Sequence, residues 1–245
     1  MHDFQAIVLA AGRGARMNSD LPKVLHPVCG RPMVSHVLDA LRSAGIPKPV
    51  VVIGEDGDQM ERALGENYIY VRQEHQLGSG HAVMCARGAA EGKARNILVM
   101  CGDSPLFRVE TIRSLMRGHQ REQATITLVS AVLEDPGGYG RILRDERGRI
   151  IGIVEEKLAD TRQRTIKEVN GGCYAFDAEW LWGSIDTMRR NHVAEYCLTE
   201  MVDIATAQGR RVTAVSAEPD EVLGVNTPAQ LGAAERIMRA RGMCA

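Results

Sequence analysis

Short apolar runs alternate along this chain with segments in which apolar residues recur every three or four positions. The short runs have the length of strands, and the periodic segments gather their apolar side chains on one face, as amphipathic helices do. The pattern predicts strands at 6–10, 49–53, 68–71, 96–101, 125–132, 169–176 and 212–215. It predicts helices at 32–44, 59–64, 79–90, 109–119, 180–188, 198–207 and 228–241, the last with a Thr227 cap and Pro228 in its first turn.

This alternation favours an α/β fold with a mostly parallel, Rossmann-like sheet and helices on both faces. After about residue 135 the pattern changes, and 141–154 reads as a hairpin turning at Asp145–Gly148, a β-rich insertion. We expect one domain over residues 1–245, with a first half to about 135, a second half over about 136–226 and a C-terminal helix at 227–241. Ligands of such sheets bind at the carboxyl ends of the strands.

Composition and charge narrow the class of protein. The chain has 245 residues and a formal charge of −1, which argues against a nucleic-acid partner. Its apolar runs are too short to span a membrane, and no basic segment followed by a long apolar one begins the chain, so a cytoplasmic protein is expected. The six cysteines show no Cys-x-x-Cys spacing, and we expect all of them to be reduced thiols.

The stretch from Leu9 to Lys23, LAAGRGARMNSDLPK, follows the first predicted strand and has the composition of a phosphate-binding loop. It is not a dinucleotide fingerprint, because Met17 stands where the third glycine of Gly-x-Gly-x-x-Gly belongs. It is not a Walker loop either, because Lys23 lies between Pro22 and Val24 rather than in Gly-Lys-Ser/Thr.

The residue types in this loop nevertheless suit a nucleoside triphosphate. Small residues let the backbone approach a ligand closely and turn its N–H groups inward; they are Ala10, Ala11, Gly12 and Gly14. Arg16 can grip phosphate oxygens with two donors, and Lys23 adds a point charge. We therefore predict a triphosphate site here rather than a surface turn with solvated cations.

The same stretch resembles the signature of the sugar-nucleotide pyrophosphorylases, and most closely the uridyltransferase domain of the bifunctional N-acetylglucosamine-1-phosphate uridyltransferases/glucosamine-1-phosphate acetyltransferases. Six further motifs continue the resemblance in order from about residue 4 to 237: QLGSGHA (76–82), CGDSPL (101–106), GYGRI (138–142), GIVEEK (152–157), AEYCLTE (194–200) and GVNTPAQL (224–231). It implies a cytoplasmic transferase that makes UDP-N-acetylglucosamine, a cell-wall precursor, from UTP and N-acetylglucosamine 1-phosphate. It also implies a nucleotide-binding first half and a sugar-binding second half, in a monomer or weak homo-oligomer.

The resemblance assigns roles by position. Arg16 and Lys23 would be catalytic, binding the triphosphate and stabilising the departing pyrophosphate, and Asp103 and Asn226 would hold Mg²⁺. The substrate-binding positions would be Leu9, Ala10, Ala11, Gly12 and Gly14 for the phosphates, Gln73, Gly78 and Ser79 for the base, and Gly140, Glu155 and Asn170 for the sugar. From the residues alone, Asp103 is equally a turn-former, and Asn226 is more often a residue flanking a helix cap.

Several positions depart from the family pattern. Cys101 and Cys197 stand where tyrosine is common, Gly171–Gly172 replaces Thr-Gly, and Glu200 replaces aspartate. The last three lie on the sugar side, so another sugar 1-phosphate or another nucleotide stays open, as does a non-catalytic nucleotide-binding homologue. A Rossmann oxidoreductase is disfavoured by Met17. The hexapeptide repeats of the family's acetyltransferase domain do not occur in this sequence, so we expect no acetyl transfer from this chain.

Overall fold

The computed structural model describes residues 2–191 and 194–244. The strands are β1 (His2–Ala10), β2 (Pro27–Val28), β3 (Arg31–Pro32), β4 (Val50–Ile53), β5 (Ile69–Arg72), β6 (Ala94–Cys101), β7 (Ile126–Val132), β8 (Arg141–Arg144), β9 (Ile150–Val154), β10 (Glu168–Asp177) and β11 (Val212–Ser216). The α-helices are α1 (Met33–Ala44), α2 (Gly57–Leu64), α3 (Ser79–Cys85), α4 (Arg87–Ala90), α5 (Val109–Glu122), α6 (Thr161–Arg164), α7 (Ala178–Ser184), α8 (Glu200–Ala207) and α9 (Pro228–Ala240). Three short 3₁₀ turns, at Ala15–Met17, Lys23–Leu25 and Ile185–Thr187, complete the described elements.

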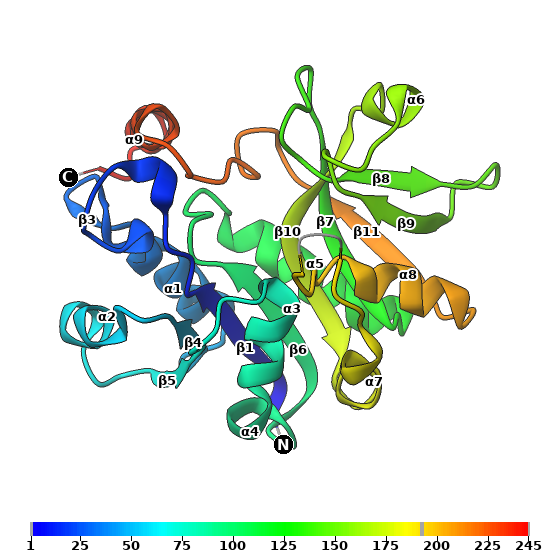
Figure 1. The fold of residues 1–245 in the computed structure, drawn as a ribbon, viewed down its shortest axis with the longest axis horizontal. Coiled ribbons are helices and arrows are strands. Elements are labelled where there is room, and N and C mark those ends of the chain that lie inside the picture. The colour runs from blue at the N-terminus through cyan, green and yellow to red at the C-terminus, as the bar shows by residue number, and fades with distance from the viewer. Residues whose placement is uncertain (1, 192–193, 245) are drawn as a thin grey trace.

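The main sheet runs in the order β11-β7-β10-β6-β1-β4-β5 (Figure 1). Strand β1 pairs in parallel with β4 and β6, and β4 with β5, while β11 pairs in parallel with β7. Strand β10 is antiparallel to β6 and β7, and through Val169 it also pairs with the β8–β9 hairpin. The prediction of an α/β fold with a mostly parallel sheet and an inserted hairpin is confirmed.

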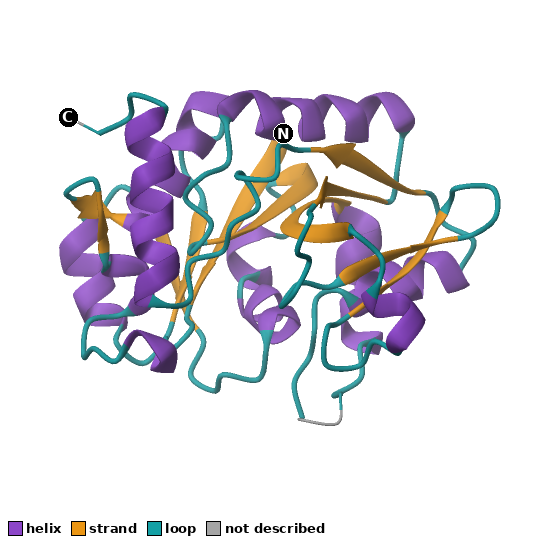
Figure 2. Ribbon diagram, turned by 90° about the horizontal axis from the view of Figure 1, so that it is seen from above, coloured by secondary structure: helices purple, strands orange, loops and turns teal. Residues whose placement is uncertain are grey.

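Helices cover both faces of the sheet because the strands are apolar on both sides. On one face Ala6 and Val8 of β1 pack in a core with residues of α1 and α5; on the other, Ile7 packs with residues of α3, α7 and α8 (Figure 2). Successive side chains of β1 therefore point to opposite faces of the sheet and contribute to two separate hydrophobic cores. Among the described residues, no helix is long and apolar enough to cross a membrane.

Local structure differs from the predictions at two helices. The single helix expected at 79–90 is two short helices that meet at Ala86, which has φ −76° and ψ −8° and whose N–H bonds both the Ala82 and the Val83 carbonyl. The helix expected at 180–188 is α7 followed by the 3₁₀ turn Ile185–Thr187. By contrast, the start of α9 agrees with the prediction, since the side chain of Thr227 accepts a hydrogen bond from the Gln230 N–H.

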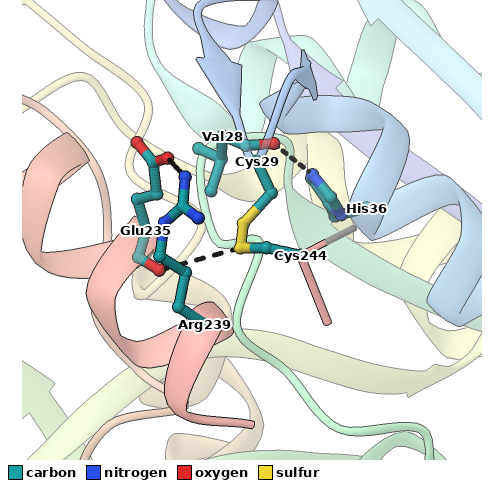
Figure 3. The surroundings of a disulfide bond; sticks show 6 residues. All are labelled: Val28, Cys29, His36, Glu235, Arg239 and Cys244. Carbon is teal, nitrogen blue, oxygen red and sulfur yellow. Dashed lines mark hydrogen bonds and ion pairs between the residues drawn. A yellow bond between two sulfur atoms is a disulfide. The ribbon is translucent and has the colours of Figure 1, made fainter. Parts of the chain in front are cut away.

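The C-terminal segment is joined to the hairpin that follows the phosphate-loop candidate. Cys29, in the β2–β3 turn, forms a disulfide with Cys244, beyond α9, with the two Cα atoms 5.0 Å apart (Figure 3). Buried Val28, Ala234 and Met238 pack together beside it. The expectation of six reduced thiols is therefore wrong for this pair. The spacing of the cysteines could not reveal it, because the two residues lie 215 positions apart and only the packing of α9 brings them together.

The cysteine pairing has a direct chemical test. The remaining thiols are those of Cys85, Cys101, Cys173 and Cys197. Thiol titration of the denatured protein without reductant is expected to find these four, and titration after reduction to find all six cysteines. The Cys244→Ser variant should give five thiols in both titrations, because Cys29 is then released. Six thiols in the unreduced wild type would contradict the pairing.

Candidate functional site

The phosphate-loop candidate leaves the carboxyl end of β1 at the centre of the sheet. Leu9 pairs in register with Cys101 of β6, and its carbonyl accepts a hydrogen bond of 2.8 Å from the Gly102 N–H. The loops after β1 and β6 therefore open at the same edge. Ala10, a predicted phosphate-binding residue, is 5% exposed, packs into the core beneath the loop and lines neither of the cavities described below.

Gly14 shapes the loop around Lys23. Its φ of +63° is in the left-handed region, and a Cβ added there would lie 2.5 Å from the Cβ of Lys23. The Met17 N–H then donates to the Gly14 carbonyl at 2.8 Å to form the 3₁₀ turn, and the Met17 side chain is buried. Gly14 is therefore needed because Lys23 packs closely against it. The spacing of the glycines in the sequence does not distinguish this role from contact with a ligand.

Four predicted site residues converge across the site from three separate loops. Lys23 Nζ makes an ion pair with Asp103 and donates to Asn226 Oδ1 at 2.9 Å. Arg16 Nη2 donates to the same Asn226 oxygen at 3.0 Å. The backbone holds the third loop in place, since the Val225 N–H donates to the Asp103 carbonyl at 2.8 Å. The side chains of Lys23 and Asp103 are only 12% and 19% exposed, so the pair is largely shielded from water.

This cluster is the part of the site that suits a metal ion. The Asp103 carboxylate and the Asn226 amide oxygen both meet the same cationic nitrogen, so a small cation at that point would find two oxygen ligands. Mg²⁺ takes oxygen ligands, commonly one or two from protein with the rest from phosphate and water. Within residues 2–191 and 194–244, no group of three or more His, Cys, Asp or Glu side chains is arranged to hold a metal.

A cavity of about 290 Å³ lies beside the cluster. Predicted site residues that line it are Leu9, Ala11, Gly12, Lys23, Gln73, Gly78, Ser79 and Asp103. Burial raises the pKa of the Cys101 thiol, which also lines the cavity, to about 12, and the nearby Asp103 carboxylate adds to the effect. The thiol is therefore neutral at physiological pH and presents a small, weakly polar wall where tyrosine is common in the family.

The base-side residues lie against the segment that precedes α8. Gly78 has φ +99°, and a Cβ there would lie 2.5 Å from the Tyr196 carbonyl oxygen, so this backbone crossing requires glycine. The Ser79 hydroxyl accepts a hydrogen bond of 3.0 Å from the Leu198 N–H. Ser79 thus anchors the crossing segment, and its hydroxyl proton is left for another acceptor.

A second cavity of about 860 Å³ adjoins the first, since Ser79 and Glu195 line both. Glu155 lines it and accepts a hydrogen bond of 2.8 Å from the Thr199 hydroxyl. Asn170 lies nearby, where its N–H donates to the Gly140 carbonyl at 2.9 Å. The predicted sugar residues therefore form one group, with Glu155 just after β9, Asn170 on β10 and Gly140 in the loop before β8.

Three polar residues that line this second cavity are not among the site residues predicted from the sequence. Arg189, Arg190 and Asp203 line it. Burial raises the pKa of Asp203 to about 6, so this carboxyl group is partly protonated close to neutral pH. Nothing in the local sequence marks these side chains, because the loop before α8 and the helix itself reach the cavity only through tertiary packing.

Two further residues of the QLGSGHA motif contact the site, although neither is among the predicted site residues. Gln76 Nε2 donates to the Ala11 carbonyl at 2.6 Å and fixes the start of the phosphate-loop candidate. His81 contacts Gln73, with 3.0 Å between Nδ1 and the amide nitrogen. Both residues lie in the QLGSGHA motif. Polar residues next to a glycine-rich turn often bond to the loop that they face, and this tendency is the sequence signal that points to them.

The two loop glycines provide a matched test of these assignments. Gly14→Ala is expected to destabilise the ligand-free protein by about 1–3 kcal/mol, because alanine is strained at positive φ and its Cβ collides with Lys23. Gly12→Ala should change the free energy of unfolding by less than about 0.5 kcal/mol, because no atom lies within 4 Å of its added Cβ.

Urea denaturation measures both changes. Equal unfolding free energies for the two variants would contradict the close packing of Gly14 on Lys23.

Comparison with known proteins agrees with this geometry. The profile of the MobA-like NTP transferase domain matches residues 6–167. The chain is 44% identical over 243 residues to the bifunctional protein GlmU of Heliobacterium modesticaldum, covering 98% of this chain and 53% of that protein. It is 44% identical over 238 residues to the GlmU of Halalkalibacterium halodurans, and 42% identical over 245 residues to that of Brevibacillus brevis.

These alignments cover 96% and 99% of this chain, and 52% and 53% of the respective relatives. The chain therefore spans about half the length of the curated relatives that it matches. With the profile matched from within β1 to the residue before β10, and with these identities along nearly its whole length, the chain belongs to the family of MobA-like NTP transferase domains.

Proposed function

We propose that this chain transfers the uridylyl group of UTP to N-acetylglucosamine 1-phosphate, forming UDP-N-acetylglucosamine and pyrophosphate. The observation that carries the proposal is the convergence of Arg16 and Lys23 with the oxygens of Asp103 and Asn226 beside the loop after β1. Two cations facing two oxygen ligands suit a triphosphate bound together with a divalent ion. The similarity to proteins named bifunctional GlmU supports the same reading.

The reaction needs little covalent chemistry from the protein. An oxygen of the sugar phosphate forms a bond to the α-phosphorus of UTP, and the bond from that phosphorus to the bridging oxygen of the β-phosphate breaks in line. The attacking oxygen is already anionic, so no general base is required. The residues bring two anions together and neutralise charge on the leaving pyrophosphate, which is positioning and electrostatic stabilisation.

Each group of residues has a part in this scheme. Lys23 and Arg16 bind the triphosphate, while the backbone of the loop around Gly12 approaches its oxygens. Asp103 and Asn226 would hold Mg²⁺, which when bound neutralises phosphate charge as a Lewis acid. Glu155, which accepts from Thr199, and Asn170 would orient the sugar hydroxyls. These assignments place the nucleotide mainly at the smaller cavity and the sugar at the larger one, with Arg16, which lines the larger cavity, between the two.

One observation favours a second candidate, a pyrophosphorylase of the same family that uses another sugar 1-phosphate. Two positions that depart from the family pattern, Cys197 and Glu200, both line the larger cavity. A cysteine where tyrosine is common leaves more room and one fewer strong hydrogen-bonding group. These two departures therefore bear on the sugar, whereas the third departing side chain, Cys101, lines the smaller cavity.

A substrate panel tests the proposal. Pyrophosphate release would be measured with UTP, CTP, GTP or dTTP against N-acetylglucosamine, glucosamine or glucose 1-phosphate, each with Mg²⁺ or with EDTA. The pair of UTP and N-acetylglucosamine 1-phosphate is expected to give the highest kcat/KM, and EDTA to reduce release to background. A preference for another sugar would support the second candidate, and activity with GTP or dTTP alone would contradict uridylyl transfer.

A further inference from the structure

Gln73 is a buried amide at the wall of the smaller cavity. It follows β5, its N–H donates to the Ile53 carbonyl at 2.8 Å, and only 4% of the residue is exposed. It lines the cavity with Ser79, Lys23 and Asp103. An amide in this position can read a base only with those of its hydrogen-bonding groups that the protein itself does not occupy.

The protein occupies both donors of this amide. Nε2 of Gln73 lies 3.0 Å from the Gly78 carbonyl oxygen and 3.0 Å from Nδ1 of His81. A carbonyl oxygen can only accept, so the amide nitrogen rather than its oxygen must face Gly78. The nitrogen carries two hydrogens, and the second is directed to His81. What the side chain can still offer a ligand is its oxygen, which can only accept.

His81 is held in the form that this arrangement requires. Burial lowers the pKa of the imidazole, and the neighbouring His75 and Arg190 lower it further, so the ring is neutral at physiological pH. Its face stacks on the ring of Tyr196 at an interplanar angle of 22°, and Cys85 Sγ lies 3.9 Å from either ring nitrogen. A neutral ring that accepts at Nδ1 carries its proton on Nε2.

We infer that His81 is a positioning residue for base selection: by accepting from Gln73 it fixes the amide so that the site presents an acceptor to the base. This inference rests on the proposed function and on the base-binding role that the family resemblance implies for Gln73. The ring N3 of uracil carries a hydrogen and can donate to that acceptor, whereas N3 of cytosine is itself an acceptor. The pocket therefore favours a base with a ring N–H and rejects cytosine, because a site built around one hydrogen bond discriminates against a base that leaves it unmade.

The test distinguishes the hydrogen-bond acceptor of the His81 ring, Nδ1, from the space that the ring fills. His81→Phe keeps a flat ring against Tyr196 and removes Nδ1, whereas His81→Asn restores a side-chain acceptor. Cys85→Ala is the matched control, because Cys85 packs on His81. For each variant, kcat and KM would be measured with UTP and CTP at saturating N-acetylglucosamine 1-phosphate, and Kd for both nucleotides by calorimetry.

In His81→Phe, the ratio of kcat/KM for UTP over CTP is expected to fall roughly tenfold, the value of one buried hydrogen bond. The change should lie in KM for UTP, with kcat nearly unchanged, because the base is remote from the reacting phosphorus. His81→Asn should recover most of the ratio, and Cys85→Ala should keep the wild-type ratio. An unchanged ratio in folded His81→Phe would overturn the inference.

Two further measurements test the inference even if the His81 variants do not fold. Long-range proton–nitrogen NMR of the wild type should show His81 Nδ1 without a proton, and a protonated Nδ1 at neutral pH would overturn the role of His81. Gln73→Ala tests the underlying proposal: unchanged UTP affinity would remove Gln73 from base recognition. That outcome differs from one in which Gln73→Ala weakens UTP binding while His81→Phe keeps its selectivity, which would reject His81 alone.

Discussion

Replacing Asp103 with alanine is expected to lower kcat by about 10²–10³-fold, because its carboxylate is a proposed ligand of the Mg²⁺ that would neutralise phosphate charge, and the loss of one such electrostatic contribution typically costs that much. The carboxylate lies just beyond the end of β6, where it meets the Lys23 ammonium group. Its removal takes away one of the two oxygen ligands proposed for Mg²⁺. Asp103→Asn keeps the size of the side chain and should lose nearly as much activity, since an amide oxygen binds Mg²⁺ less well than a carboxylate does.

The fold should survive this change. Asn226 remains a partner of Lys23 after the substitution, so the unfolding free energy should fall by no more than about 1–3 kcal/mol. Glu91→Ala removes an equal charge from an exposed position beyond α4 and should leave both turnover and stability unchanged. Manganese titration followed by electron paramagnetic resonance measures the metal affinity directly. Wild-type turnover and wild-type metal affinity in Asp103→Ala would remove this residue from the metal site.

Lys23→Ala should also lower kcat by about 10²–10³-fold and, unlike the Asp103 variants, should raise KM for UTP as well. The ammonium group is proposed to bind the triphosphate in the ground state and the pyrophosphate as it leaves, so both parameters should change. Lys23→Arg should rescue little, because the Lys23 side chain is only 12% exposed and its single ammonium nitrogen meets both Asp103 and Asn226, a geometry that a longer, planar guanidinium does not reproduce.

The control for Lys23 is Lys48→Ala, which removes a positive charge from an exposed position outside both cavities. Steady-state kinetics with UTP as the varied substrate measures both effects, and Lys48→Ala should match the wild type in each. If Lys23→Ala raised KM for UTP with kcat unchanged, Lys23 would contribute uniform binding only, and its proposed action on the leaving group would be wrong.

The elements of this fold were predictable where neighbours in the sequence determine them. The apolar run of β1 and the Thr227–Pro228 start of α9 carry their own local signals, and the structure agrees with both. The break between α3 and α4 was missed, because no glycine or proline marks Ala86. The direction of β10 was not predictable either, since its pairing with β6 and β7 depends on how the chain returns through the inserted hairpin.

The candidate site likewise has features that could be predicted from the sequence and features that could not. The loop from Leu9 to Lys23 could be recognised from residue types and spacing, whereas the role predicted for Asp103 depended on the resemblance to the family. The contact between Arg16 and Asn226 could not, because the two residues are 210 positions apart. The roles of His81 and Gln76 depend on which polar atom faces which carbonyl, and only the folded backbone determines that.

The bond between Cys29 and Cys244 closes residues 29–244 into a covalent ring. A protease that cuts one exposed loop inside this ring, such as the turn at Asp145–Gly148, opens the ring and releases neither fragment. On a denaturing gel the nicked protein would migrate as one band until a reductant separates it into two. The site's loops after β1 and β6 would therefore stay tethered to the sugar side of the molecule even after the chain between them had been severed.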